Sequence, residues 1–299
     1  MSLCFCAAMP LYLITMSISF FNGKFLPREE VKISPDDRGF LFADGIYEVV
    51  RWYEGGFFYD MPGHMARLKR SLREIRLNWP GIESFPAVAN ELINQNNLQN
   101  IPSLVYLQVT RGAAKRSHAF PGPDVLPTAY AFARGFHPEK EVIAAGINVV
   151  LRKETRWSRC DIKSVSLLPN ILSFQEAHDL DCYECIFVRD GMITECAHSN
   201  VFFVINDVLY THPESDNILS GITRKNILRI AGEAGIKVIE KPVAEKMLNE
   251  ISEAFITNTS FEIAPVISIN KIITGDGHPG PITRALREKF DKEIRSLRG

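Results

Sequence analysis

The chain has 299 residues, of which 46% are apolar, so it is long enough for one large domain or two smaller ones with a sizeable core. Its 34 Lys and Arg residues nearly cancel its 35 Asp and Glu residues, and the formal net charge of −1 excludes a strong field for nucleic acid or an anionic membrane. No polar tract or short repeat appears, which excludes disordered, collagen-like and solenoid proteins. The composition is typical of a soluble globular protein.

Six cysteines are too few and too scattered for a disulfide scaffold in a chain of this length, which favours a reducing cytoplasm. Cys182 and Cys185 form a C-x-x-C pattern. A zinc site would need a second pair or nearby histidines, so we expect ordinary thiols and no metal.

The first residues, 1–15, are apolar and have no basic start, and Pro10 interrupts them. They lack the features of a signal peptide and are too short to span a bilayer. We therefore expect a disordered or extraneous leader, with the folded chain opening at Met16.

The next part of the chain predicts a small N-terminal α+β domain over residues 16–135. Asn22-Gly23 lies between two apolar runs, which is a strong hairpin signal. Apolar residues at steps of three and four predict a helix over 63–77. A second helix is expected over 85–96, with strands over 103–112 and 128–136.

After a linker at residues 136–142, the pattern predicts a larger C-terminal domain over 143–299 with a largely antiparallel sheet. Its expected elements are a strand at 147–151, helices at 168–180 and 222–235, and hairpins at 189–191 and 205–207. A final helix over 282–297 should turn Leu286, Phe290, Ile294 and Leu297 inward.

One nucleotide-binding pattern appears near the end of the chain. Gly275, Gly277 and Gly280 spell G-x-G-x-x-G, but only nineteen residues follow Gly280. A Rossmann unit needs a second parallel strand and an acidic residue about 20 positions on, so a nicotinamide-binding protein is a weak alternative.

Lys163 and Glu195 form the more informative pair. Lys163 stands after a strand-like run and directly before an apolar helix, where partial desolvation would favour a nucleophilic amine. Glu195 leaves one strand and leads into another. Pyridoxal phosphate chemistry requires a lysine for a Schiff base and a carboxylate to keep the pyridine nitrogen protonated.

Two segments are candidates for holding a phosphate. Residues 220–224 open a helix, where free backbone N–H groups and the positive end of the dipole favour an anion. Residues 257–260 follow a strand and carry hydroxyl groups. Arg67 would add a charge-assisted contact.

Six segments in the same order together resemble the class IV aminotransferases, the fold-type IV group of pyridoxal phosphate enzymes, over about residues 18–292. They read DGIYEVV (44–50), HMARL (64–68), RCDIKS (159–164), TECAHSNVF (194–202), GITR (221–224) and TNT (257–259). The resemblance implies a two-domain α+β fold, with a small N-terminal α/β domain and a larger β-rich pseudobarrel domain with helices.

The resemblance also implies residue roles. Lys163 corresponds to the Schiff-base lysine and proton shuttle, Glu195 to the partner of the pyridine nitrogen, and Tyr47 to the tyrosine near the substrate carboxylate. Arg67 corresponds to the phosphate-binding arginine. The remaining cofactor contacts implied are Ser199, Leu219, Ile222, Thr223 and Thr259.

Arg116 and His118 form an R-x-H pattern that resembles the D-amino-acid transaminases of this family. There it traps the substrate α-carboxylate from the neighbouring subunit, which implies a homodimer and a ping-pong transamination of D-amino acids with 2-oxo acids. Branched-chain L-amino-acid or (R)-amine transaminase, aminodeoxychorismate lyase and a non-catalytic dimer remain as alternatives. The chain departs from the family pattern at Ala197-His198 and Asn258, where serines are usual.

Overall fold

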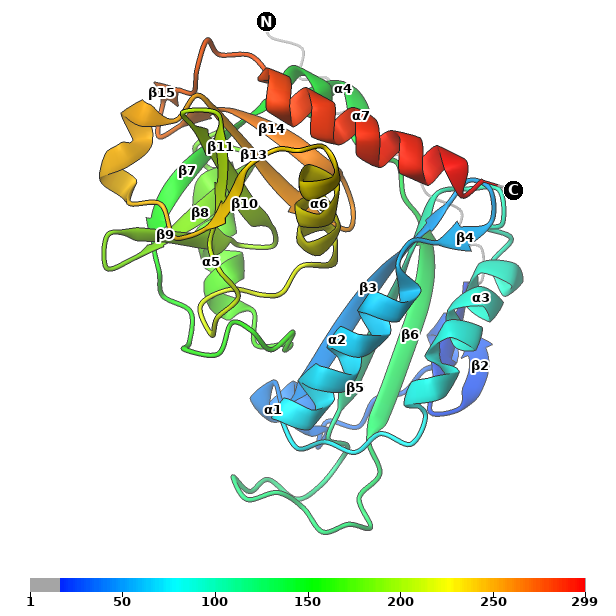
Figure 1. Cartoon of the computed structure of the whole chain (residues 1–299). Helices are drawn as coiled ribbons and strands as arrows, with labels where there is room; N and C mark the ends of the chain where they lie inside the picture. The colour runs from blue at the N-terminus through cyan, green and yellow to red at the C-terminus, as the bar shows by residue number, and fades with distance from the viewer. Residues whose placement is uncertain (1–16, 299) are drawn as a thin grey trace, which may run out of the picture.

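The computed structural model describes residues 17–298, so the expected leader lies outside the described residues. Figure 1 shows two sheets, each with its own helices, lying beside one another with the C-terminal helix crossing above both. Among the described residues, no helix is both long enough and apolar enough to cross a membrane.

The first sheet has six strands in the order β2-β1-β6-β5-β3-β4, and all its pairings are antiparallel. The predicted hairpin is confirmed, because Asn22 and Gly23 take the left-handed backbone that its turn requires, with φ of 47° and 87°. The strands are β1 (Ile18–Phe21), β2 (Lys24–Pro27), β3 (Gly45–Tyr53), β4 (Phe57–Phe58), β5 (Ser103–Thr110) and β6 (Thr128–Gly135).

Two helices, α2 (Met61–Glu74) and α3 (Phe85–Gln95), pack against this sheet and bury an apolar stripe. Leu68, Leu72 and Leu92 lie in the resulting core. The helix predicted over 63–77 is shorter at its C-terminal end, because Arg76 takes a left-handed backbone with φ of 52°. A short helix α1 (Arg38–Phe42) and two 3₁₀ turns (Arg28–Glu30 and Ile82–Ser84) complete this half.

The second sheet has nine strands and curls into a half barrel (Figure 1). Most pairings are antiparallel, as expected, but β7–β8, β7–β14 and β11–β12 are parallel. Both predicted hairpins are present. The strands are β7 (Ile147–Lys153), β8 (Glu184–Arg189), β9 (Met192–Cys196), β10 (Asn200–Ile205), β11 (Val208–Thr211), β12 (Val238–Glu240), β13 (Glu253–Asn258), β14 (Glu262–Ile269) and β15 (Ile272–Ile273).

Helices α4 (Lys140–Ala145), α5 (Leu168–His178), α6 (Ile222–Glu233) and α7 (Pro281–Ser296), with a 3₁₀ helix at Glu245–Glu250, surround this sheet. The stretch 136–142, expected as a linker, contains the start of α4. Leu297 is 50% exposed, so the expectation that it faces inward is wrong. The glycine pattern at 275–280 follows the antiparallel β14–β15 hairpin, which is not the setting of a Rossmann loop.

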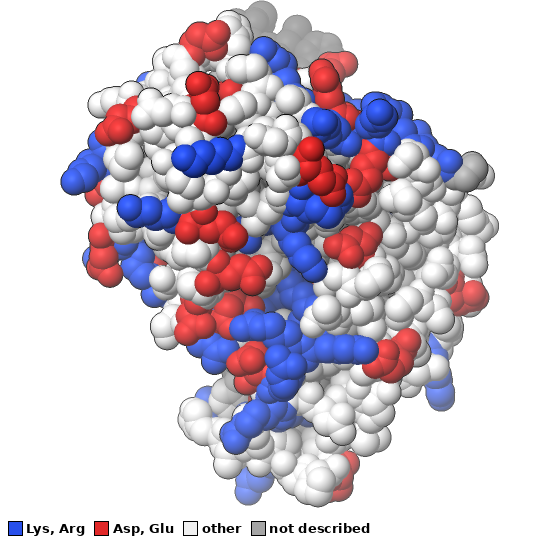
Figure 2. Space-filling view, viewed as in Figure 1, with Lys and Arg blue, Asp and Glu red and all other residues white. Residues whose placement is uncertain are grey.

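The two halves meet along a band rich in ion pairs. Arg70 on α2 binds Asp161 at 2.5 Å, and Arg159 binds Glu74 on α2 at 2.6 Å. Figure 2 shows Lys and Arg side chains running along the boundary between the halves, with Asp and Glu beside them. These contacts tie the segment that carries Lys163 to the small N-terminal sheet and its helices.

Candidate active site

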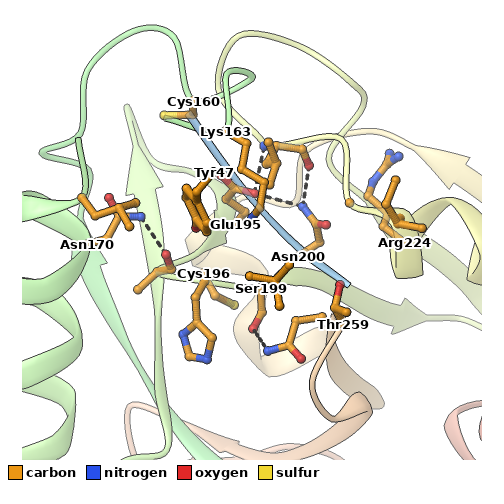
Figure 3. A pocket seen from close by; sticks show the side chains of 18 of the residues that line it. Tyr47, Cys160, Lys163, Asn170, Glu195, Cys196, Ser199, Asn200, Arg224 and Thr259 are labelled. Carbon is orange, nitrogen blue, oxygen red and sulfur yellow. Dashed lines mark hydrogen bonds between the residues drawn. The ribbon is translucent and has the colours of Figure 1, made fainter. Parts of the chain in front are cut away.

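A cavity of about 200 Å³ opens between the two halves, and residues from both of them line it. Figure 3 shows Tyr47, Lys163 and Glu195 in the same part of this cavity. The structure brings together nine residues to which the sequence assigned catalytic or cofactor roles: Tyr47, Arg67, Lys163, Glu195, Ser199, Leu219, Ile222, Thr223 and Thr259.

Lys163 is held by its backbone on both sides. Its N–H donates to Ser71 Oγ at 3.3 Å, and its carbonyl accepts from the Tyr47 N–H at 3.0 Å. Its Nζ lies 4.2 Å from the centre of the Tyr47 ring. The ring of Tyr47 stacks in turn on Tyr106, with 5.7 Å between centroids. The amine therefore stands against a fixed aromatic wall in the cavity.

Glu195 lies near the end of β9 as a buried carboxylate with three donors around it. Arg156 Nη1 contacts Oε1 at 2.6 Å, while Asn200 Nδ2 and the Leu219 N–H donate to Oε2 at 2.9 and 3.0 Å. Burial raises the pKa of Glu195 to about 7, and Arg156 and Leu219 limit the rise. A carboxylate has about four acceptor positions, so Glu195 retains capacity for one further donor.

Arg67 reaches the cavity from α2 and is fixed by a buried carboxylate. Its Nε and Nη2 bind the two oxygens of Glu48 at 3.0 and 2.6 Å, and Nη1 donates to the Ser220 carbonyl at 3.1 Å. Burial opposes ionisation of Glu48, yet Arg67 and His64 hold its pKa well below the ordinary value. A guanidinium has five N–H donors, so Arg67 keeps donors for an anion.

The opposite wall offers further donors for an anion. Helix α6 begins after Gly221 with no side chain capping its first N–H groups, and Ile222 and Thr223 line the cavity there. Thr257 also lines the cavity, and its buried hydroxyl has no hydrogen-bond partner among the described residues. With Thr259 and Arg67, these groups form a cradle suited to a phosphate.

Arg116 and His118 lie elsewhere, on the 111–127 segment that joins β5 to β6. The Arg116 guanidinium lies 4.9 Å from the centre of the Phe42 ring, and the His118 ring lies 5.5 Å from the same ring. Neither lines the cavity formed by this chain. Arg116 and His118 thus lie close together and outside the cavity of their own chain. Their expected role in the cavity of a second subunit stays a prediction.

Sequence reasoning gave no role to several residues that support the site. Arg156 is one of many arginines in the chain, and no local pattern marks it as the partner of Glu195. Asn200 belongs to a recognised segment, but its bonds to Glu195 and to the Leu219 carbonyl depend on the folded chain. The pairing of Glu48 with Arg67 follows from strand β3 facing helix α2, which alternation along β3 could have suggested.

Comparison with known proteins agrees with this geometry. Residues 45–269 match the model of the family described as amino-transferase class IV. The chain belongs to the class IV aminotransferases. D-alanine aminotransferase of Staphylococcus haemolyticus is 40% identical over 282 residues, covering 94% of this chain and 99% of the relative. That of Bacillus licheniformis is 39% identical over 279 residues, covering 92% and 96%.

Solved structures of this family share the fold. The branched-chain aminotransferase of the archaeon Thermoproteus uzoniensis, solved with norvaline, has a TM-score of 0.84 at 25% identity, covering 94% of this chain and 95% of that one. Class IV aminotransferases are pyridoxal phosphate enzymes, and this aminotransferase is therefore one too. Its cavity fits that cofactor, since a lysine amine, a carboxylate with spare acceptor capacity and an anion cradle share one space.

Proposed function

We propose that this aminotransferase exchanges amino groups between D-amino acids, of the D-alanine and D-glutamate type, and 2-oxo acids. The observation that carries the proposal is the placing of Lys163 and Glu195 in one cavity beside the uncapped start of α6. The preference for D-amino acids is supported by the D-alanine aminotransferases, which resemble the chain over nearly its whole length.

Each cofactor-binding residue has a task that follows from its position. Arg67, the first N–H groups of α6 and the hydroxyls of Thr257 and Thr259 would hold the phosphate, whereas the Ser199 hydroxyl donates to Glu184 Oε2 at 3.3 Å. The Leu219 side chain would pack against the ring. Glu195 would accept the N–H of the pyridine nitrogen at its spare acceptor position and keep that proton in place. Asn200 and Arg156 orient the carboxylate for this contact.

When bound, pyridoxal phosphate supplies an aldehyde for amino-group exchange and a ring that takes up the electron pair released at the substrate α-carbon. Lys163 Nζ would be the base that takes the substrate α-proton and the acid that returns it, and a water molecule would supply the oxygen of the 2-oxo acid that leaves. The second half-reaction runs the same proton transfers in reverse with the incoming 2-oxo acid. The Tyr47 ring, stacked on Tyr106, fixes one side of the space in which Nζ moves.

Two copies of the chain would form the complete site. Helix α5 exposes Leu168, Ile171 and Leu172 at 66%, 60% and 57%, next to residues that line the cavity. A cluster of exposed apolar side chains favours a protein partner. Docking of a second copy there would also let its Arg116 and His118 reach the open cavity and bind the substrate α-carboxylate.

The four cysteines of the described residues are free, which supports a cytoplasmic location.

A half-reaction panel tests the proposal. Holoenzyme is mixed with D-alanine, L-alanine, D-glutamate, L-leucine or (R)-phenylethylamine, and the change in the visible absorption of the cofactor is followed. Reaction with D-alanine and D-glutamate, with little from the others, is the expected result. Reaction confined to L-leucine or to the amine would instead identify a branched-chain or an (R)-amine transaminase.

A further inference from the structure

His198 occupies the turn between β9 and β10, at a position where the family pattern has a small residue. It lines the cavity that contains Lys163 and also a second hollow bounded by Phe174 and Phe261. Asn258 and Ser260 likewise line both spaces. Lys163 is near enough for its charge to act on the imidazole. The ring therefore lies at the boundary between the two spaces.

The imidazole of His198 is held in one orientation. Its Nδ1 contacts Glu184 Oε2 at 2.5 Å, and the Phe174 and Phe261 rings meet it edge-on with centroids at 5.1 and 6.3 Å. Glu184 is fully buried and also accepts from the Cys185 N–H at 3.0 Å. An anchor of this kind fixes both the ring plane and the nitrogen that faces outward.

The other nitrogen of this ring, Nε2, has no hydrogen-bond partner among the residues at 17–298, and 45% of the side chain is exposed. Partial desolvation by the surrounding groups opposes a charge on the ring, but the Glu184 carboxylate outweighs it and raises the pKa of His198. With Nδ1 bound to a carboxylate, the protonated ring presents Nε2–H as a charge-assisted donor.

The remaining basic side chains of the cavity already have partners or tasks. Arg156 binds Glu154 and Glu195, and Arg224 binds Glu240 and the His212 carbonyl. Arg67 is fixed by Glu48 at the phosphate cradle, and Lys163 serves the cofactor. Of the basic side chains that line the cavity within the described residues, His198 thus has a donor left for the distal end of a substrate.

We propose that His198 is a specificity-determining residue, whose Nε2–H binds a carboxylate at the far end of the substrate side chain and so favours dicarboxylic amino acids and 2-oxo acids. The inference rests on the proposed function, because it assigns the side-chain subsite of the same reaction. Glu184 acts as a positioning residue, since it touches the imidazole and not the substrate.

The first test compares two substrates of equal length that differ in charge, D-glutamate and D-glutamine. A hydrogen bond from this donor to a charged acceptor contributes about twice as much binding free energy as one to a neutral amide. His198→Gln should therefore lower the ratio of kcat/KM for D-glutamate to kcat/KM for D-glutamine about 5- to 10-fold. His178→Gln is the matched control, because His178 lines the second hollow but not the cofactor cavity. An unchanged ratio in His198→Gln refutes the inference.

The second test measures binding without turnover. Titration calorimetry on holoenzyme compares glutarate, with two carboxylates, and pentanoate, with one on a chain of the same length. Glutarate should bind more tightly to the wild type, and His198→Gln should reduce that preference about 10- to 100-fold. If His198→Gln folds poorly, the same comparison is made with His198→Ser, and the preference of the wild type for glutarate over pentanoate is measured in either case. Equal binding of the two acids by the wild type refutes the inference.

The two proposals fail in different ways. A holoenzyme inert toward D-alanine and D-glutamate contradicts the proposed function, while the comparison of glutarate with pentanoate still reports on His198. A holoenzyme that transaminates D-alanine but shows no dependence on His198 in either ratio keeps the function and refutes the side-chain subsite.

Discussion

Arg156 stabilises the site by neutralising two buried carboxylates. Its Nη1 contacts Glu195 at 2.6 Å, its Nη2 contacts Glu154 at 2.6 Å, and the three side chains are only 6%, 6% and 2% exposed. Arg156→Met keeps most of the apolar stem but leaves Glu195 buried without its cation and Glu154 with only Arg189, at 4.0 Å. Breaking such a buried pair typically costs about 3–5 kcal/mol, so we expect a loss of that size in the free energy of unfolding.

The assay is urea unfolding of each variant at one fixed concentration of cofactor, because a bound cofactor adds to stability by mass action. Arg152→Met is the matched control, since Arg152 pairs at 2.7 Å with Glu176, which is 60% exposed. A pair of this type is worth at most about 1 kcal/mol. Equal losses in the two variants would refute the claim that Arg156 offsets the burial of Glu195 and Glu154.

Two further predictions concern a buried carboxylate and the expected second subunit. The pKa of Glu48 is held well below its ordinary value near 4.5. The ionised Glu48 carboxylate therefore stabilises the folded protein fully above about pH 4.5, and this stabilisation is lost as the pH falls further. Glu48→Gln should therefore be less stable than wild type at pH 7, with a difference that shrinks in acid-unfolding curves below about pH 4.5. Arg116→Met should raise KM for D-alanine about 10- to 100-fold, since it removes a charge-assisted contact. If two subunits share each site, mixing Arg116→Met with Lys163→Ala, assayed at a D-alanine concentration far below the raised KM, should restore up to about a quarter of the sites. Proven heterodimers without activity would place Arg116 and Lys163 in one subunit's site.

Local sequence signals located most elements of the fold. The Asn22-Gly23 turn, the apolar stripe of α2 and the two later hairpins follow from short-range patterns, and each is present in the structure. The end of α2 was misplaced because the apolar periodicity continues past Glu74 while the backbone turns left-handed at Arg76. The parallel pairing of β7 with β8 and β14 depends on contacts far apart in the chain, which no window of sequence contains.

In the candidate site, too, local sequence signals identified some residues, while others depend on contacts between distant parts of the chain. Glu195 and the start of α6 could be selected from the sequence, because one lies near the end of a strand and the other opens a helix. Lys163 could be selected from the segment around it, although it lies in the loop between β7 and α5 and not directly before the helix as expected. Their supporting partners could not, since Arg156 meets Glu195 across 39 positions and Arg67 contacts the Ser220 carbonyl across 153. The anchoring of His198 by Glu184 likewise requires β8 to lie beside β9.

The central claim is that Lys163 carries the cofactor in the cavity between the two halves. Holoenzyme is reduced with borohydride, digested and mapped by mass spectrometry. The account predicts a pyridoxyl group on Lys163 and its loss in Lys163→Ala. A pyridoxyl group on another lysine in the reduced wild type would contradict it.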